Sequence, residues 1–89
     1  MDKKEALKII KKDGGLELEN LPDHFKKDKE IVLAAVKQYG RALEYADDSL
    51  KKDKEVVLEA VKQDGLALQF ADESLRNDPD ILAIVNKKK

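Results

Sequence analysis

Cysteine and tryptophan are absent from this 89-residue sequence, and histidine occurs once. Without cysteine the chain forms no disulfide, offers no thiolate nucleophile and binds no metal through cysteine. Two tyrosines and two phenylalanines are its only aromatic residues, which leaves few rings for stacking on nucleic-acid bases. Positive charge is not in excess, since 18 basic residues face 19 acidic ones. The composition therefore argues against cysteine-based catalysis and against nucleic-acid binding.

Long hydrophobic runs are missing as well. The longest spans six residues, from Ile31 to Val36, whereas a membrane-spanning helix needs about 20. The residues that follow Met1 are charged and contain no apolar core of a signal peptide. We therefore expect a soluble chain with no membrane partner, and the sequence leaves its compartment open.

What the sequence does contain is an internal repeat. Residues 28–52 recur without a gap as residues 53–77, at an offset of 25 residues. Asp2 begins a more divergent copy, in which Gly15 is interpreted as one residue inserted at a turn. Asp78 begins a fourth copy of the first half only, which we interpret as shortened by one residue near its start. A fixed period of this size predicts stacked units, each too small to bury its apolar face alone.

The expected fold is accordingly all-α. It is a short α-solenoid of about three and a half repeats, each a helix, a turn and a short helix, with a repeat length of 25 residues. We assign a single domain to residues 1–89. Its units are residues 2–27, 28–52 and 53–77, with a partial capping unit at residues 78–89.

The first half of each unit has the signals of a helix of about three turns. An aspartate begins every copy, where its side-chain oxygen can accept from the unpaired N–H groups of the first turn. These aspartates are Asp2, Asp28, Asp53 and Asp78. Pro79 occupies a favoured first helical position. We expect Gly14, Gly40 and Gly65 to end their helices in the left-handed conformation.

Four apolar positions recur in all copies and define the expected core face. They are Ala6, Val32, Val57 and Ile81; Leu7, Leu33, Leu58 and Leu82; Ile9, Ala35, Ala60 and Ile84; and Ile10, Val36, Val61 and Val85. A further position is apolar in the inner copies, at Ile31 and Val56, and acidic in the outer ones, at Glu5 and Asp80. Because nothing stacks beyond a terminal repeat, we interpret the two acidic residues as caps on the outer faces.

The inner copies resemble a known family. Their motif Asp-Lys-Glu-Val-Val-Leu-x-Ala-Val-Lys-Gln-x-Gly, followed by Ala-Leu-x-Phe/Tyr-Ala and Ser-Leu-Arg/Lys, is similar to the tandem short helical repeat catalogued as domain of unknown function 4116. The resemblance is close over residues 28–77, weaker over residues 2–27 and partial from Asp78 on. It implies a helical repeat with no assigned activity, and it carries over no catalytic residue.

Residue patterns that would indicate catalysis or metal binding are not found. His24 occupies the position that Ser49 and Ser74 take in the inner copies, which indicates a structural turn or cap. The acidic pairs Asp47-Asp48 and Asp72-Glu73 lack the pattern of a calcium-binding loop. We therefore expect no enzyme, no cofactor and no metal site.

Exposed positions that differ between copies can form the recognition surface of a repeat scaffold. We select Tyr39, Arg41, Asp64 and Leu66 as candidate partner-binding residues, the alternative being ordinary drift at tolerant positions. The predicted function is a non-catalytic protein–protein interaction or spacer scaffold, monomeric in isolation, with an unknown protein as partner.

Two other functions stay open as alternatives. One is a nucleic-acid-binding module that uses a lysine edge, which a net charge of −1 disfavours. The basic edge comprises Lys11, Lys37, Lys51, Lys52, Lys62 and Arg76. The other is a regulatory or targeting fragment of a larger enzyme.

Overall fold

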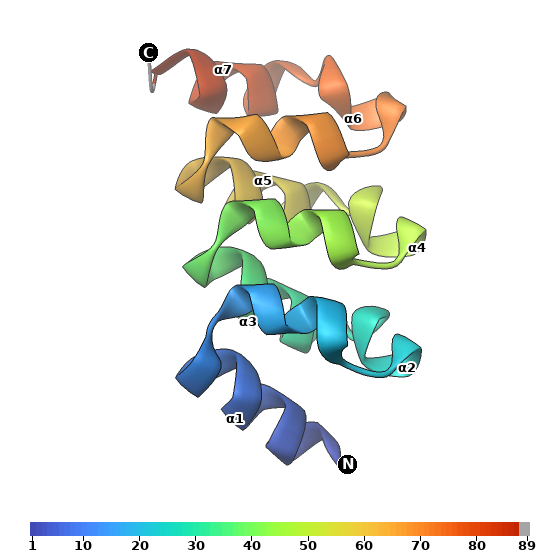
Figure 1. Cartoon of the computed structure of the whole chain (residues 1–89). Helices are drawn as coiled ribbons and strands as arrows, with labels where there is room; N and C mark the ends of the chain where they lie inside the picture. The colour runs from blue at the N-terminus through green and yellow to red at the C-terminus, as the bar shows by residue number, and fades with distance from the viewer. Residues whose placement is uncertain (88–89) are drawn as a thin grey trace.

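The computed structural model describes residues 1–87, and every regular element in that part of the chain is a helix. Long α-helices alternate with 3-10 helices and one-turn α-helices (Figure 1). In chain order the elements are α1 (Lys3–Asp13), η1 (Gly15–Asn20), α2 (Asp23–Lys26), α3 (Lys29–Gln38), η2 (Gly40–Tyr45), α4 (Asp48–Lys51), α5 (Lys54–Gln63), η3 (Gly65–Phe70), α6 (Glu73–Arg76) and α7 (Pro79–Lys87). Residues 88–89 of the expected partial unit lie outside the described residues. None of the described helices is both long and apolar enough to cross a membrane.

The units stack into an elongated body of 38 × 22 × 15 Å, which confirms the predicted all-α repeat fold. Turns between the long helices and the 3-10 helices follow one another along one edge, at the left in Figure 1, and α2, α4 and α6 line the opposite edge. Backbone hydrogen bonds join neighbouring units at the second edge. The N–H of Asp47 donates to the carbonyl of Lys26, and that of Asp72 donates to Lys51, each at 3.0 Å.

The core lies where the long helices meet the 3-10 helices. Fully buried side chains recur from unit to unit, because each unit covers the apolar face of its neighbour. The largest are Ile10, Leu18, Ile31, Val32, Val36, Leu43, Val56, Val57, Val61 and Ile81. The recurring leucine position was wrongly placed in this core. Leu7, Leu33 and Leu58 are only half-buried, because this position lies at the margin of the helix face that the core covers.

The predicted aspartate caps are confirmed. Asp28 accepts hydrogen bonds from the backbone N–H groups of Glu30 and Ile31, at 3.0 and 3.3 Å. Asp53 caps α5 in the same way, and Asp2 accepts the N–H of Glu5. These bonds pair N–H groups that the first helical turn leaves without a partner. The helix starts are therefore encoded locally.

The glycines do not end helices in the expected left-handed conformation. Gly40 and Gly65 begin 3-10 helices, and the residues before them, Tyr39 and Asp64, follow the ends of α3 and α5 in extended backbone. Among the described residues only Gly14 has a positive φ, of 107°, and its ψ of 161° lies outside the left-handed helical region. Close approach of the next unit, rather than backbone handedness, explains Gly40.

The extra residue of the first unit is not the expected insertion at Gly15. Helix α1 contains 11 residues, whereas α3 and α5 contain 10 each, so the additional residue lengthens the helix. Gly15 then begins η1 as Gly40 begins η2. A Cβ on Gly15 would overlap the carbonyl oxygen of Ala35. Packing thus fixes this glycine, while a helix absorbs one residue by adding one backbone hydrogen bond.

The fourth unit is not shortened near its start. Asp78 accepts from the N–H groups of Asp80 and Ile81, at 2.9 and 3.4 Å, as Asp53 accepts from Glu55 and Val56. Ile81 therefore matches the buried Val56. The apolar pattern of α7 imitates that of the inner helices one residue out of step, which is why the sequence suggested a deletion.

This register corrects the proposed pair of acidic end caps. Asp80 matches Glu55, an acidic position in the inner units as well, and so does not mark an outer face. Glu5 does occupy the position of Ile31, because the N–H of each donates to the aspartate three residues before it. Glu5 is exposed, whereas Ile31 is fully buried.

Candidate functional site

The four predicted partner-binding residues lie on the edge of turns that connect long helices to 3-10 helices. We call this surface the turn edge, and it comprises Leu16, Tyr39, Arg41, Asp64 and Leu66. The exposed fractions are 49% for Leu16, 38% for Tyr39 and 59% for Leu66. Apart from Met1, these are the exposed large hydrophobic residues of the described chain. One of them falls in each complete unit, at equivalent turns.

Arg41 and Asp64 bind each other across two units. The guanidinium Nε of Arg41 donates to Oδ2 of Asp64 at 2.6 Å, and Oδ1 of Asp64 accepts the N–H of Leu66 at 2.9 Å. Two of the four candidate residues therefore hold the turn edge together. The sequence did not indicate this pair, because its partners are 23 residues apart and occupy different positions of the repeat.

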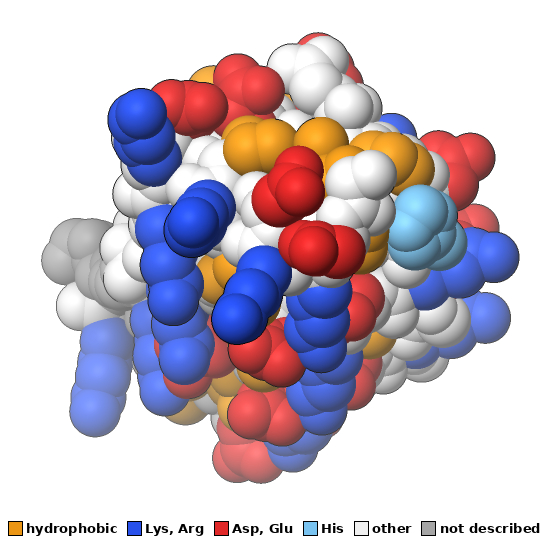
Figure 2. All heavy atoms as spheres, turned by 90° about the horizontal axis from the view of Figure 1, so that it is seen from below, with side chains coloured by type: hydrophobic (Ala, Val, Ile, Leu, Met, Phe, Trp, Pro, Cys, Tyr) orange, Lys and Arg blue, Asp and Glu red, His pale blue; other side chains and the backbone are white. Residues whose placement is uncertain are grey.

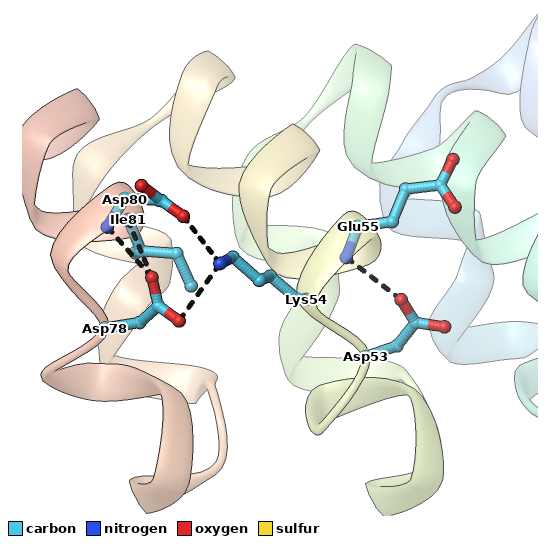
Figure 3. A network of polar contacts seen from close by, with 6 residues as sticks. All are labelled: Asp53, Lys54, Glu55, Asp78, Asp80 and Ile81. Atoms are coloured by element: carbon cyan, nitrogen blue, oxygen red, sulfur yellow. Dashed lines mark hydrogen bonds and ion pairs between the residues drawn. The ribbon is translucent and has the colours of Figure 1, made fainter.

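Lysine side chains make a second set of contacts between units, which we call the lysine clamps. Lys54 reaches from α5 to Asp78 and Asp80 at the start of α7, at 3.3 and 2.7 Å (Figure 3). Lys29 contacts Asp53 and Glu55 in the same way, at 2.9 and 2.8 Å. Lys3 contacts Asp28 and Glu30. The recurring Asp-Lys-Glu was the sequence signal for these contacts. Its lysine follows the capping aspartate of one unit, as Lys29 follows Asp28, and contacts the capping aspartate of the next unit, Asp53.

The clamps alter the ionisation of the capping aspartates. Partial burial opposes ionisation of Asp53, but the ion pair with Lys29 and the N–H groups of Val56 and Glu55 outweigh it, so the pKa of Asp53 lies below its ordinary value of 3.8. The pKa values of Asp28 and Asp78 are lowered by the same balance. The three carboxylates are therefore stabilised in their charged form.

We expect Asp53→Ala to lower the free energy of unfolding by about 1 kcal/mol at neutral pH, through loss of an inner cap. Because folding depresses the pKa of this carboxyl, its contribution is present above the unfolded pKa of 3.8. It is lost as the pH falls through the lower folded-state pKa. Urea unfolding at neutral pH should separate the variant from the parent, and the difference should shrink at acidic pH. Asp2→Ala, at a terminus that frays more easily, should cost less, and equal losses at both caps would contradict this account.

The serines and acidic pairs at the short helices also have structural roles. Asp47 accepts from both the N–H and the hydroxyl of Ser49, at 3.0 and 2.7 Å, and Asp72 makes the same two bonds with Ser74. Both hydrogen bonds from Ser49 lower the pKa of Asp47, and the bond from the hydroxyl contributes more than the bond from the N–H. In the first unit His24 takes the serine position and packs against the ring of Phe25, with centroids 4.0 Å apart.

An apolar groove between α1 and α3 was not indicated by the sequence. It has a volume of about 410 Å³ and is lined by Leu7, Lys11, Glu30, Leu33, Ala34, Lys37 and Gln38. The groove ends beside the turn edge, because Gln38 is followed in the chain by Tyr39. The sequence did contain one signal for the groove. The same position of the repeat is alanine in the second unit, at Ala34, and glutamate in the third unit, at Glu59.

Acidic and histidine side chains do not gather into a candidate metal centre. In the part of the chain that the structure describes, no group of three or more such residues is placed to hold a metal ion. The carboxylates that do approach one another serve as helix caps or contact lysines.

Comparison with known proteins identifies a family and nothing more specific. The family model described as Domain of unknown function (DUF4116) matches residues 2–51 and 53–88. No curated protein and no solved structure matches the chain. The family match spans both inner units and extends over the divergent first unit and the partial fourth one. The chain therefore belongs to the family of helical repeats described as Domain of unknown function (DUF4116).

Proposed function

We propose that this chain is a non-catalytic module, a short section of an α-solenoid, that binds a protein partner through its turn edge. The observation that carries the proposal is the placement of Leu16, Tyr39 and Leu66. Each is an exposed large hydrophobic side chain, and all three lie at equivalent turns of successive units. Apolar side chains in such a row favour contact with another protein.

The polar residues of the turn edge support the same function. The Arg41–Asp64 ion pair joins the second unit to the third, so it restrains the spacing between Tyr39 and Leu66. Tyrosine and arginine are also enriched among residues that contribute most to protein interfaces. A partner that contacts the turn edge would thus meet a surface whose shape is set before binding.

The lysine edge gives less support to the nucleic-acid alternative. Lys62 forms an ion pair with Glu59 at 3.6 Å, and Lys51 lies 3.9 Å from Asp48. Lys62 lies at the end of α5 beside the turn edge, whereas Lys51 lies in α4 on the opposite edge, so the predicted basic residues do not form one row along which phosphate groups could bind. The alternative of a regulatory or targeting fragment of a larger enzyme is compatible with partner binding. It concerns only the protein of which this chain would be a part.

The proposed function is tested by photo-crosslinking in an extract of the source organism. Benzoylphenylalanine placed at position 39 should give discrete crosslinked products, whereas the same group at position 52, on the opposite edge, should not. Adding Leu16→Ser and Leu66→Ser should reduce the products by about tenfold, since each removes apolar contact area from the interface.

Circular dichroism should show that the two serine variants keep the helical content of the parent, because both leucines are exposed. Identical products from positions 39 and 52, or products that persist in the serine variants, would show that the turn edge is not the binding surface.

A further inference from the structure

The groove between α1 and α3 combines an apolar floor with a basic rim. Leu7, Leu33 and Ala34 supply the apolar part, and all three are half-buried. Lys11 and Lys37 stand at the rim. Lys4 and Lys8 continue the same surface on the other side of Leu7, where they line an adjoining hollow of about 280 Å³. Figure 2 looks at this end of the stack and shows many basic side chains there, with acidic side chains between some of them and hydrophobic side chains visible beside them.

The rim lysines lack acidic partners within the described chain, unlike Lys3, Lys29 and Lys54 of the lysine clamps. Among the described residues, no ion pair is formed by Lys4, Lys8, Lys11 or Lys37. Glu30 is the acidic residue that lines the groove, and Lys3 already contacts it at 2.9 Å. The rim therefore carries uncompensated positive charge, although the whole chain has a net charge of −1.

Between α3 and α5, the next pair of long helices, the position that matches Ala34 is filled by a larger side chain. In α5 the residue that matches Ala34 is Glu59, and its carboxylate contacts Lys62 at 3.6 Å. Lys62 matches Lys37. The third unit thus supplies from its own chain both the bulk and the negative charge that the α1–α3 groove lacks. A partner for the groove should bring the same two properties.

We propose that the α1–α3 groove binds an acidic amphipathic helix of a partner protein. Lys4, Lys8 and Lys11 follow one another at helical spacing over about 10 Å of α1, so glutamates at the same spacing on a neighbouring helix lie opposite them. Apolar residues on the inner face of that helix contact Leu7 and Leu33. The inference rests on the proposed function, because it names the chemistry of one partner element, on a surface next to the turn edge.

The test uses a synthetic helical peptide of about three to four turns, with leucines on one face and glutamates beside them. Its binding to the full chain is followed by fluorescence anisotropy. A peptide of the same composition in scrambled order should bind at least about tenfold more weakly, because its leucines no longer share one face. Equal binding of both peptides, or no binding of either, would overturn the proposal.

Matched variants of the chain locate the site. Ala34→Glu installs the residue that the next unit carries, so it should keep the fold and weaken peptide binding by about tenfold or more. Glu59→Ala makes the reverse exchange at the neighbouring unit and leaves the α1–α3 groove intact, so it should not weaken peptide binding. Lys8→Glu with Lys11→Glu should weaken binding as Ala34→Glu does, whereas Lys27→Glu with Lys52→Glu, on the opposite edge, should not.

A single-stranded oligonucleotide serves as the competing probe. If it binds as well as the acidic peptide and its binding is insensitive to Ala34→Glu, the lysines act as a phosphate-binding surface and the proposal is wrong. Crosslinking from position 39 separates this inference from the proposed function. Suppose that the Ala34→Glu variant no longer binds the acidic peptide but still gives the crosslinked products. The partner then does not use the groove, and the groove proposal is overturned while the proposed function stands.

Discussion

We expect Gly40→Ala to lower the free energy of unfolding by about 3 kcal/mol, a large part of the stability of a chain this small. A Cβ on Gly40 would overlap the carbonyl oxygen of Ala60 and lie 3.1 Å from the backbone N of Asp64. Both neighbours are backbone atoms of the next unit, so no side-chain rotation relieves the overlap. Urea unfolding followed by circular dichroism measures the loss.

Gly65→Ala is the matched control for this prediction. Gly65 begins η3 as Gly40 begins η2, but a Cβ there would meet only Cγ1 of Val85, at an ordinary contact distance of 3.6 Å. Its φ is not positive, so alanine fits the backbone and should change stability by less than about 1 kcal/mol. Equal losses at the two glycines would show that close approach of the next unit does not explain Gly40.

Leu43→Ala should lower the free energy of unfolding by about 2–5 kcal/mol. Leu43 lies in η2, the middle one of the three 3-10 helices in the described chain, and its side chain is fully buried. Truncation removes apolar contacts and leaves a cavity that units packed on both sides cannot easily close. The loss appears as a lower midpoint in urea with an unchanged slope.

Leu68→Ala tests whether burial by both neighbours causes the effect. Leu68 matches Leu43 one unit later but is only half-buried, because no further 3-10 helix follows η3 in the described chain. Its truncation should cost clearly less than that of Leu43. If the two variants lose equal stability, the stacking of 3-10 helices is not what stabilises the middle of the molecule.

The helix starts could be predicted from the sequence because each depends on a few neighbouring residues. Asp53 accepts from N–H groups two and three residues ahead, and this geometry follows from the aspartate and the first helical turn alone. The repeat at residues 28–52 and 53–77 was equally visible, and the family match agrees with it. Local chemistry and periodicity thus gave the elements and their order.

The contacts between units could not be read in the same way. Arg41 and Asp64 were selected separately as variable positions, yet they form one ion pair. The groove at Ala34 arises from a small residue in one unit facing leucines of two helices. Such features depend on which positions of successive units lie opposite each other. A linear alignment of the repeats does not contain the distances between side chains of different units.

By itself the sequence determined the helical repeat, the capping aspartates and the absence of cysteine chemistry, because composition, period and local hydrogen bonding fix these. The tertiary structure alone decided why Gly40 is a glycine, that Ile81 and not Asp80 matches Val56, and that Leu58 lies at the margin of the core. Each of these depends on how closely neighbouring units approach and on the rotation of one helix against the next. Stacking, rather than the single unit, sets both quantities.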